Sequence, residues 1–182
     1  MDSAFIYRAA NELVKNAGTR NIKEIARSCS LDISETSRIK DILGLLSLYF
    51  DKPLILINRH LNKQTKQLVC GYALGHYLEH QLLMDLHTLN KFLSIKDKHI
   101  LLYEHNAFTS HLMLDSDEVY QMTKRGLDAA QISASKRIHL NLVLVKLLEL
   151  HHLGYDLRHY HEQHHAFIEH FKLPRYFRFD AA

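Results

Sequence analysis

Residues 68–80 read LVCGYALGHYLEH, an apolar run that ends in two histidines four positions apart. Asn62 lies just upstream and can cap a helix over residues 63–79. Because residues four apart share one face of an α-helix, His76 and His80 would point the same way. With only 2 prolines and 6 glycines, the chain favours a mostly helical protein around this segment.

The segments on either side of this helix predict a small sheet and several further helices. Two β-like runs, 42–50 and 54–57, are separated by Asp51-Lys52-Pro53, which suits a hairpin because proline blocks strand continuation. A weak strand at 31–33 would make a third strand. Apolar periodicity predicts helices at 4–16, from Asn21 to Cys29, and at 83–92, 99–113, 119–125, 128–135 and 136–152, with a polar turn at 94–98. The fold class is therefore α+β and predominantly helical, with a β-hairpin or three-stranded sheet on a helix bundle.

Composition narrows the classes of partner. The net charge of +3 is small and the basic residues are scattered, so we expect no direct contact with nucleic acid. No apolar run approaches a membrane span, and the N-terminus shows no secretory signal. We expect Cys29 and Cys70 to be small buried residues kept reduced. Together these features predict a cytoplasmic protein without a membrane partner.

The second half of the central helix matches part of a metal-binding motif. In H-E-x-x-H metallopeptidases, the two histidines bind zinc and the glutamate acts as general base. His76 stands at the second histidine, whereas Tyr72 and Ala73 stand where the first histidine and the glutamate would be. The motif therefore lacks one ligand and the base.

Three segments together resemble the ImmA/IrrE family of small zinc metallopeptidases, found on phages and mobile elements and among regulators that cut helix-turn-helix repressors. Residues 52–58 read KPLILIN and match the family hairpin kP-I-I-I-N. Residues 71–80 match the L-G-H-Y-L frame and final histidine of the family's metal helix. Residues 104–108 read EHNAF and keep three positions of the frame E-A-N-x-F-A, which carries the third ligand. The resemblance covers residues 4–154.

This resemblance implies that Tyr72, His76 and Glu104 face one another, with Asn106 in the same pocket. A phenol with a pKa near ~10 is a poor zinc ligand at neutral pH. Ala73 has no group with which to take a proton from water. We therefore expect no catalytic residue at positions 72 and 73, His76 and Glu104 as remnants of a metal site, and no cofactor, with zinc as the metal of any retained activity. The Tyr72 side chain should fill the space of the metal, with its hydroxyl nearest His76 or Glu104.

An alternative enzymatic interpretation uses the same helix. Residues 76–80 also spell H-x-x-E-H, the inverted zincin motif. In that case His76 and His80 would bind zinc with Glu104, and Glu79 would be the base. Histidine is abundant, at 15 of 182 residues, so composition alone can produce this pattern. An active zinc metalloprotease acting through residues 76–80 stays open as the alternative.

The function predicted from these residues is regulation by binding rather than by catalysis. We expect an ImmA/IrrE-like protein with an impaired site that captures a phage or mobile-element helix-turn-helix repressor, as an antirepressor does. Residues 1–125 would form the metallopeptidase-like domain and 126–182 a helical, partner-facing region. Three basic residues in that region, Lys136, Arg137 and Lys146, are too few and too dispersed for a DNA-binding motif.

The C-terminal tail is rich in histidine and aromatic residues. We expect His161, His164 and His165 to be solvated rather than metal-binding, since no Cys or carboxylate lies at ligand spacing. The aromatic ending Tyr176-Phe177-Arg178-Phe179 is expected to dock onto the core, because exposed aromatic patches are costly unless they are used.

Overall fold

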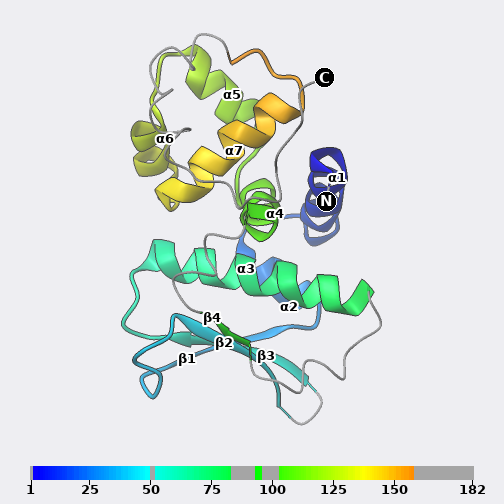
Figure 1. Ribbon diagram of the computed structural model, residues 1–182, viewed down its shortest axis with the longest axis vertical. Helices are drawn as coiled ribbons and strands as arrows, with labels where there is room; N and C mark the ends of the chain where they lie inside the picture. The colour runs from blue at the N-terminus through cyan, green and yellow to red at the C-terminus, as the bar shows by residue number, and fades with distance from the viewer. Residues whose placement is uncertain (1, 50–51, 83–92, 96–102, 158–182) are drawn as a thin grey trace, which may run out of the picture.

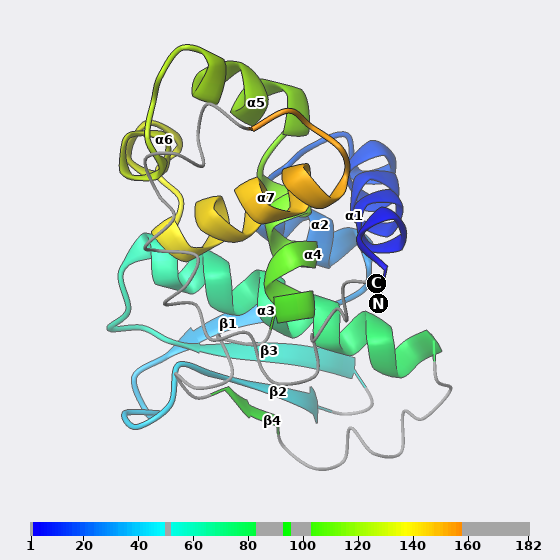
Figure 2. The same ribbon diagram turned by 45° about the horizontal axis from the view of Figure 1, so that its top comes forward.

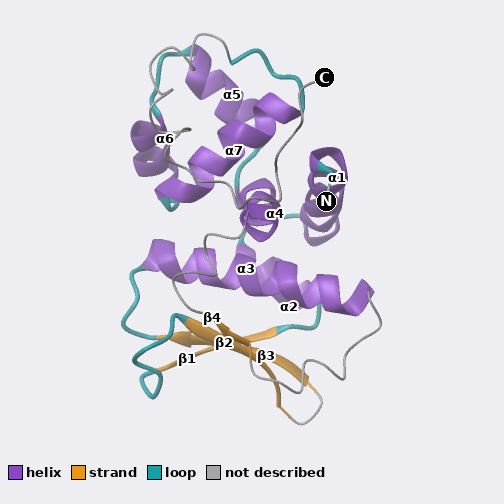
Figure 3. Cartoon of the chain, in the orientation of Figure 1, coloured by secondary structure: helices purple, strands orange, loops and turns teal. Residues whose placement is uncertain are grey.

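A mixed four-stranded sheet forms one layer of the protein, and a long helix, α3 (Lys63–Leu82), lies across one face of it (Figure 1). The computed structural model describes residues 2–49, 52–82, 93–95 and 103–157. The helix predicted at 83–92, the start of the helix predicted at 99–113 and the tail after residue 157 lie outside these ranges. Above α3, the helices from the second half of the chain form a second and thicker layer (Figure 3).

The sheet has the strand order β1-β3-β2-β4. The predicted hairpin is confirmed as β2 (Gly44–Tyr49) and β3 (Lys52–Asn58), which pair antiparallel. Pro53 is tolerated because β1 (Asp32–Thr36) pairs with β3 only from Leu54 onward, in parallel. The weak strand expected at 31–33 corresponds to β1.

The prediction of a polar turn over 94–98 is wrong at its start. Leu93–Ile95 forms β4, which pairs antiparallel with β2 at the edge of the sheet. A three-residue strand is too short to show an alternating pattern, and its pairing with a neighbouring strand decides its conformation.

Helix α3 is enclosed through its middle. Its N-terminus is capped as predicted, because Asn62 Oδ1 accepts from the backbone N–H of Thr65 at 2.8 Å. Every residue from Leu68 to Leu74 is buried, whichever way it points. A helix that is buried all round must have partners on several sides. The sheet provides one of them, and α2 (Ile22–Ser28) and α4 (Tyr103–Met113) provide others.

Two N-terminal helices pack beside this layer. Helix α1 (Ser3–Ala17) ends at Gly18, whose φ of 66° is the left-handed conformation that glycine adopts freely. Helix α2 (Ile22–Ser28) begins at Asn21, whose side chain accepts from the N–H of Lys23. Both helices were predicted from periodicity and their terminal residues.

Helix α4 (Tyr103–Met113) lies between α3 and the last helix, α7 (Leu140–His152), as both views show (Figure 2). Helices α5 (Ser116–Lys124) and α6 (Ala129–Lys136) connect them. Asp115 caps α5, and Asp128 forms a capping box with Gln131 at the start of α6. The helices predicted for this part of the chain are confirmed.

These elements confirm a predominantly helical α+β fold. One large apolar core runs from the sheet through α3 to α7. Within the described ranges, no helix combines the length and hydropathy that crossing a bilayer requires. Cys29 is partly buried, Cys70 is fully buried, and neither forms a disulfide. The division into residues 1–125 and 126–182 stays a prediction.

Candidate functional site

Helices α3 and α4 cross closely at two glycines of α3. Gly71 and Gly75 are four residues apart and therefore share one face. A Cβ added at position 71 would overlap the methyl group of Thr109 and lie 2.8 Å from its Oγ1. A Cβ at position 75 would lie 3.1 Å from Phe108 Cδ1 and 3.3 Å from His105 Cδ2. The two glycines thus allow α4 to bring its side chains against the central helix.

Three rings gather at this crossing. The ring centroid of Tyr72 lies 4.9 Å from that of His105, with the planes tilted by 50°. The ring of His76 lies 5.5 Å from the same histidine, with a tilt of 57°. His105 therefore sits between the two positions where the ImmA/IrrE frame places histidine ligands on the metal helix.

The positions of the missing motif residues are parts of the core. Tyr72 is 2% exposed and Ala73 is completely buried. Asn106, which was expected in the same pocket, is 2% exposed on α4. Glu104 lines the pocket described next, together with its neighbour His105. Tyr72 and His76 both approach His105, and the meeting of Tyr72, His76 and Glu104 in one pocket stays a prediction.

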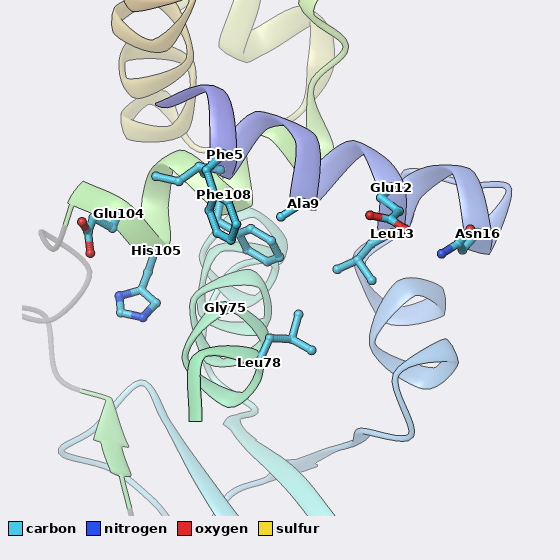
Figure 4. Close-up of a pocket in the computed structure, with 11 residues that line it drawn as sticks. Phe5, Ala9, Glu12, Leu13, Asn16, Gly75, Leu78, Glu104, His105 and Phe108 are labelled. Atoms are coloured by element: carbon cyan, nitrogen blue, oxygen red, sulfur yellow. The ribbon is translucent and has the colours of Figure 1, made fainter. Parts of the chain in front are cut away.

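A pocket of about 290 Å³ opens between α1, α3 and α4 (Figure 4). Its wall is mostly apolar, with acidic residues contributed by α1 and α4. Helix α1 contributes Phe5, Ile6, Ala9, Glu12, Leu13 and Asn16, α3 contributes Gly75 and Leu78, and α4 contributes Glu104, His105 and Phe108. The pocket therefore adjoins the helix crossing through Gly75 and His105.

The donor set at the crossing does not fit the zinc ion that the family uses. In the part of the chain that the structure describes, no three His, Cys, Asp or Glu side chains are grouped so that they could hold a metal. A zinc site needs at least three good protein ligands, and a phenol at Tyr72 is a poor substitute. Glu79 and His80 lie on α3, but their side chains are outside the described part, so the inverted motif stays a prediction.

The sequence did not predict that His105 contacts the rings of Tyr72 and His76. The frame E-A-N-x-F-A directed attention to its neighbour, Glu104, as the third ligand. The signal that could have identified His105 is the pair Gly71 and Gly75, which marks the face of α3 that another helix approaches. On α4, residues 105, 108 and 109 lie on one face by helical spacing and meet that pair.

A second polar cluster lies on the other side of α4, against α7. Lys146 Nζ donates to Nδ1 of His111 at 2.7 Å and to Oγ of Ser116 at 2.8 Å. Nε2 of His111 is 3.1 Å from a carboxylate oxygen of Glu149. All three charged or ionisable side chains are completely buried. Since an ammonium group can only donate, Nδ1 accepts and the imidazole proton is on Nε2, which donates to the carboxylate.

The other carboxylate oxygen of Glu149 is also satisfied. It accepts from the hydroxyl groups of Tyr103 and of Ser3, the latter at 3.0 Å, and Nδ1 of His152 lies 3.5 Å away. This network joins α1, α4, α5 and α7. Lys146, which the sequence presented as one of several scattered basic residues, is thus an interior side chain.

Burial and hydrogen bonding set the protonation of this cluster. Burial lowers the pKa of Lys146 to about 7, and the nearby Arg20 charge adds to that effect. Burial also lowers the pKa of His111 and outweighs the opposing hydrogen bond to Glu149. Burial alone would raise the pKa of Glu149, but hydrogen bonds from His111, His152 and Tyr103 lower it below its usual range. Near neutral pH the cluster therefore contains an ionised Glu149 and a neutral His111.

Comparison with known protein families agrees with the geometry. The sequence profile of a peptidase family described as IrrE N-terminal-like domain matches residues 35–148. The match begins in β1, includes the whole helix crossing and extends into α7. A comparison with curated proteins found no match. With the profile covering more than half of the sequence, the chain belongs to the ImmA/IrrE family of metallopeptidase-like proteins.

Proposed function

We propose that this protein regulates a helix-turn-helix repressor of a phage or mobile element by binding it, without hydrolysing it. The observation that supports this proposal best is the state of α3 at the motif positions. Tyr72 and Ala73 stand where the family has a histidine ligand and the catalytic glutamate, and both are buried in the core. The phenol of Tyr72 is a poor zinc ligand, and the methyl group of Ala73 cannot accept a proton.

The chemistry of hydrolysis requires both missing residues. A zinc peptidase uses its metal to acidify water and a carboxylate to receive the proton. At position 73 a methyl group has replaced that carboxylate. At position 72 a neutral phenol packs against His105 instead of an imidazole pointing at a metal. Because the metal ligand and the base act in the same step, loss of either one is enough to disable this mechanism.

The partner is proposed from family membership. ImmA/IrrE proteins act on helix-turn-helix repressors, and a scaffold that keeps the shape of the family can keep the surface that recognises such a protein. Capture of the repressor would prevent it from dimerising or from reaching its operator, so induction would not require cleavage.

The test combines affinity capture with a cleavage assay. The full chain is used to isolate its partner from the native host, and the captured repressor is then incubated with the protein and added zinc. We expect a stable complex in which mass spectrometry finds the repressor at its full length. Clipped repressor, with cleavage abolished by Glu79→Gln or His80→Ala, would overturn the proposal and favour the active inverted-motif protease. Capture that yields no helix-turn-helix protein would also contradict it.

A further inference from the structure

The pocket between α1, α3 and α4 has an apolar middle and an acidic residue at each end. Figure 4 shows Glu104 on α4 at one end and Glu12 on α1 at the other. Phe5, Phe108 and Leu78 lie between them. A ligand that matches this surface needs apolar groups in its centre and positive charge on both sides.

The mouth of the pocket leaves an aromatic side chain in contact with water. Phe5 is 45% exposed, and within the described ranges Leu140, at 38%, is the other large exposed hydrophobic residue. Covering apolar surface gains free energy in proportion to the area removed from water. At about 290 Å³ the pocket is near the lower limit for small-ligand sites, which suits one or two inserted side chains.

The C-terminal tail of the same chain has the complementary pattern. Residues 174–179 read PRYFRF, so Tyr176 and Phe177 are flanked by Arg175 and Arg178, with no carboxylate in the six residues. The described chain ends at Leu157, and the next 25 residues (158–182) can extend over roughly 80 Å, so reach does not limit where they bind.

We infer that residues 174–179 bind in the pocket between α1, α3 and α4. Tyr176 and Phe177 cover the apolar middle and the exposed ring of Phe5, and the two arginines pair with Glu12 and Glu104. Arginine–carboxylate pairs of this kind are frequently bidentate and orient the bound segment. Because the tail belongs to the same chain, its effective concentration is high and a weak contact is sufficient. The bound tail covers the side of the helix crossing where Gly75 and His105 lie.

Fluorescence of the full-length chain tests this inference, because the protein contains no tryptophan. A Phe177→Trp reporter should emit at short wavelength and resist quenching by acrylamide. Adding Ala9→Leu, which fills the pocket from α1, should shift the emission to longer wavelength and raise the quenching constant. Ala130→Leu is the matched control, since it makes the same change at an exposed position of α6 and should leave both readings unchanged. Circular dichroism checks that each variant is folded, and Tyr176→Trp serves as a second reporter.

Charge-reversal variants test the proposed arginine–carboxylate pairs at the two ends of the pocket. Glu12→Arg should expose the tryptophan, and Arg175→Glu or Arg178→Glu in the same chain should restore its protection. A tryptophan that is fully accessible in the otherwise unchanged chain would overturn the inference. A protected tryptophan that ignores both Ala9→Leu and Glu12→Arg would also overturn it, because the tail would then bind elsewhere. No repressor is used, so failure here leaves the proposed function untouched.

Discussion

The two sides of α4 place histidines in opposite surroundings. Towards α3, His105 packs against the rings of Tyr72 and His76, the two residues predicted to stand at the family's histidine positions. Towards α7, His111 lies in a buried chain between Lys146 and Glu149. The first side joins the helices through ring packing and close backbone approach, whereas the second joins them through charge. Within the described residues, the completely buried charged or hydrogen-bonded groups His111, Lys146 and Glu149 thus lie on the α7 side of α4, apart from the ring cluster at α3.

Substitutions on the two sides of α4 should therefore change the stability of the protein for different reasons. Removal of a group from the charged side leaves an unpaired charge in the interior, which is costly. A change on the packed side alters volume, and its cost depends on how far the neighbouring side chains can move. The predictions below would each reverse or sharpen that contrast.

The largest effect is expected for Glu149→Ala. The substitution leaves Lys146 and His111 buried without their carboxylate, so the free energy of unfolding should fall by about 3 to 5 kcal/mol. Urea denaturation followed by circular dichroism measures it. The matched control is Glu118→Ala, which removes a half-exposed carboxylate paired with Lys136 and should cost about 0 to 1 kcal/mol. Equal losses for the two variants would contradict the role given to the buried cluster.

A smaller loss is expected for Gly71→Ala on the packed side. The new methyl group would overlap Thr109, and relieving that overlap should cost about 1 to 3 kcal/mol. In the Gly71→Ala and Thr109→Ala double variant, the space opened on α4 should restore part of the lost stability. If Gly71→Ala alone were neutral in urea denaturation, the helices would not cross as closely as described.

The pH dependence of stability should come from the charged side. Lys146 has a folded-state pKa of about 7, against an ordinary value of 10.5. Between these values the unfolded chain binds the extra proton, so stability rises with pH, by roughly 1 to 2 kcal/mol from pH 7 to 9. The lowered pKa of His111 acts in the same direction below its ordinary value of 6.5, where acid favours the unfolded chain. Lys146→Met should flatten the rise between pH 7 and 9 in denaturation curves. A wild-type curve that falls with pH in that window would be incompatible with a buried, weakly basic Lys146.

Lys146→Met should also produce the smallest and most local effect, a change in the pKa of His111. Because the Lys146 charge contributes to lowering the pKa of His111, Lys146→Met should raise that pKa, as followed by NMR titration of the imidazole. An unchanged His111 titration would mean that the lysine and the imidazole are not coupled.

The helices and the hairpin could be predicted from the sequence because the signals for them are local. Asn62, Asp115 and Gly18 mark helix ends by their own conformational preferences, and the run around Pro53 marks the hairpin. The sequence could not reveal β4, whose three residues are extended only because β2 pairs with them. Nor could it show that Lys146 is interior, since burial of a lysine depends on His111 and Ser116, which lie 35 and 30 positions away. The sequence placed the candidate site on residues of α3 and α4, but it did not indicate that His105 contacts Tyr72 and His76, because that contact follows from how the two helices pack.

Metal content tests the central claim most directly, namely that the helix crossing no longer holds zinc. The purified full-length protein is incubated with zinc, dialysed and measured by plasma mass spectrometry beside the Tyr72→His, Ala73→Glu double variant. We predict substoichiometric zinc in the wild type and a gain towards about one zinc per chain in the double variant, which regains a family ligand. One zinc per wild-type chain, lost on His76→Ala, would contradict the account.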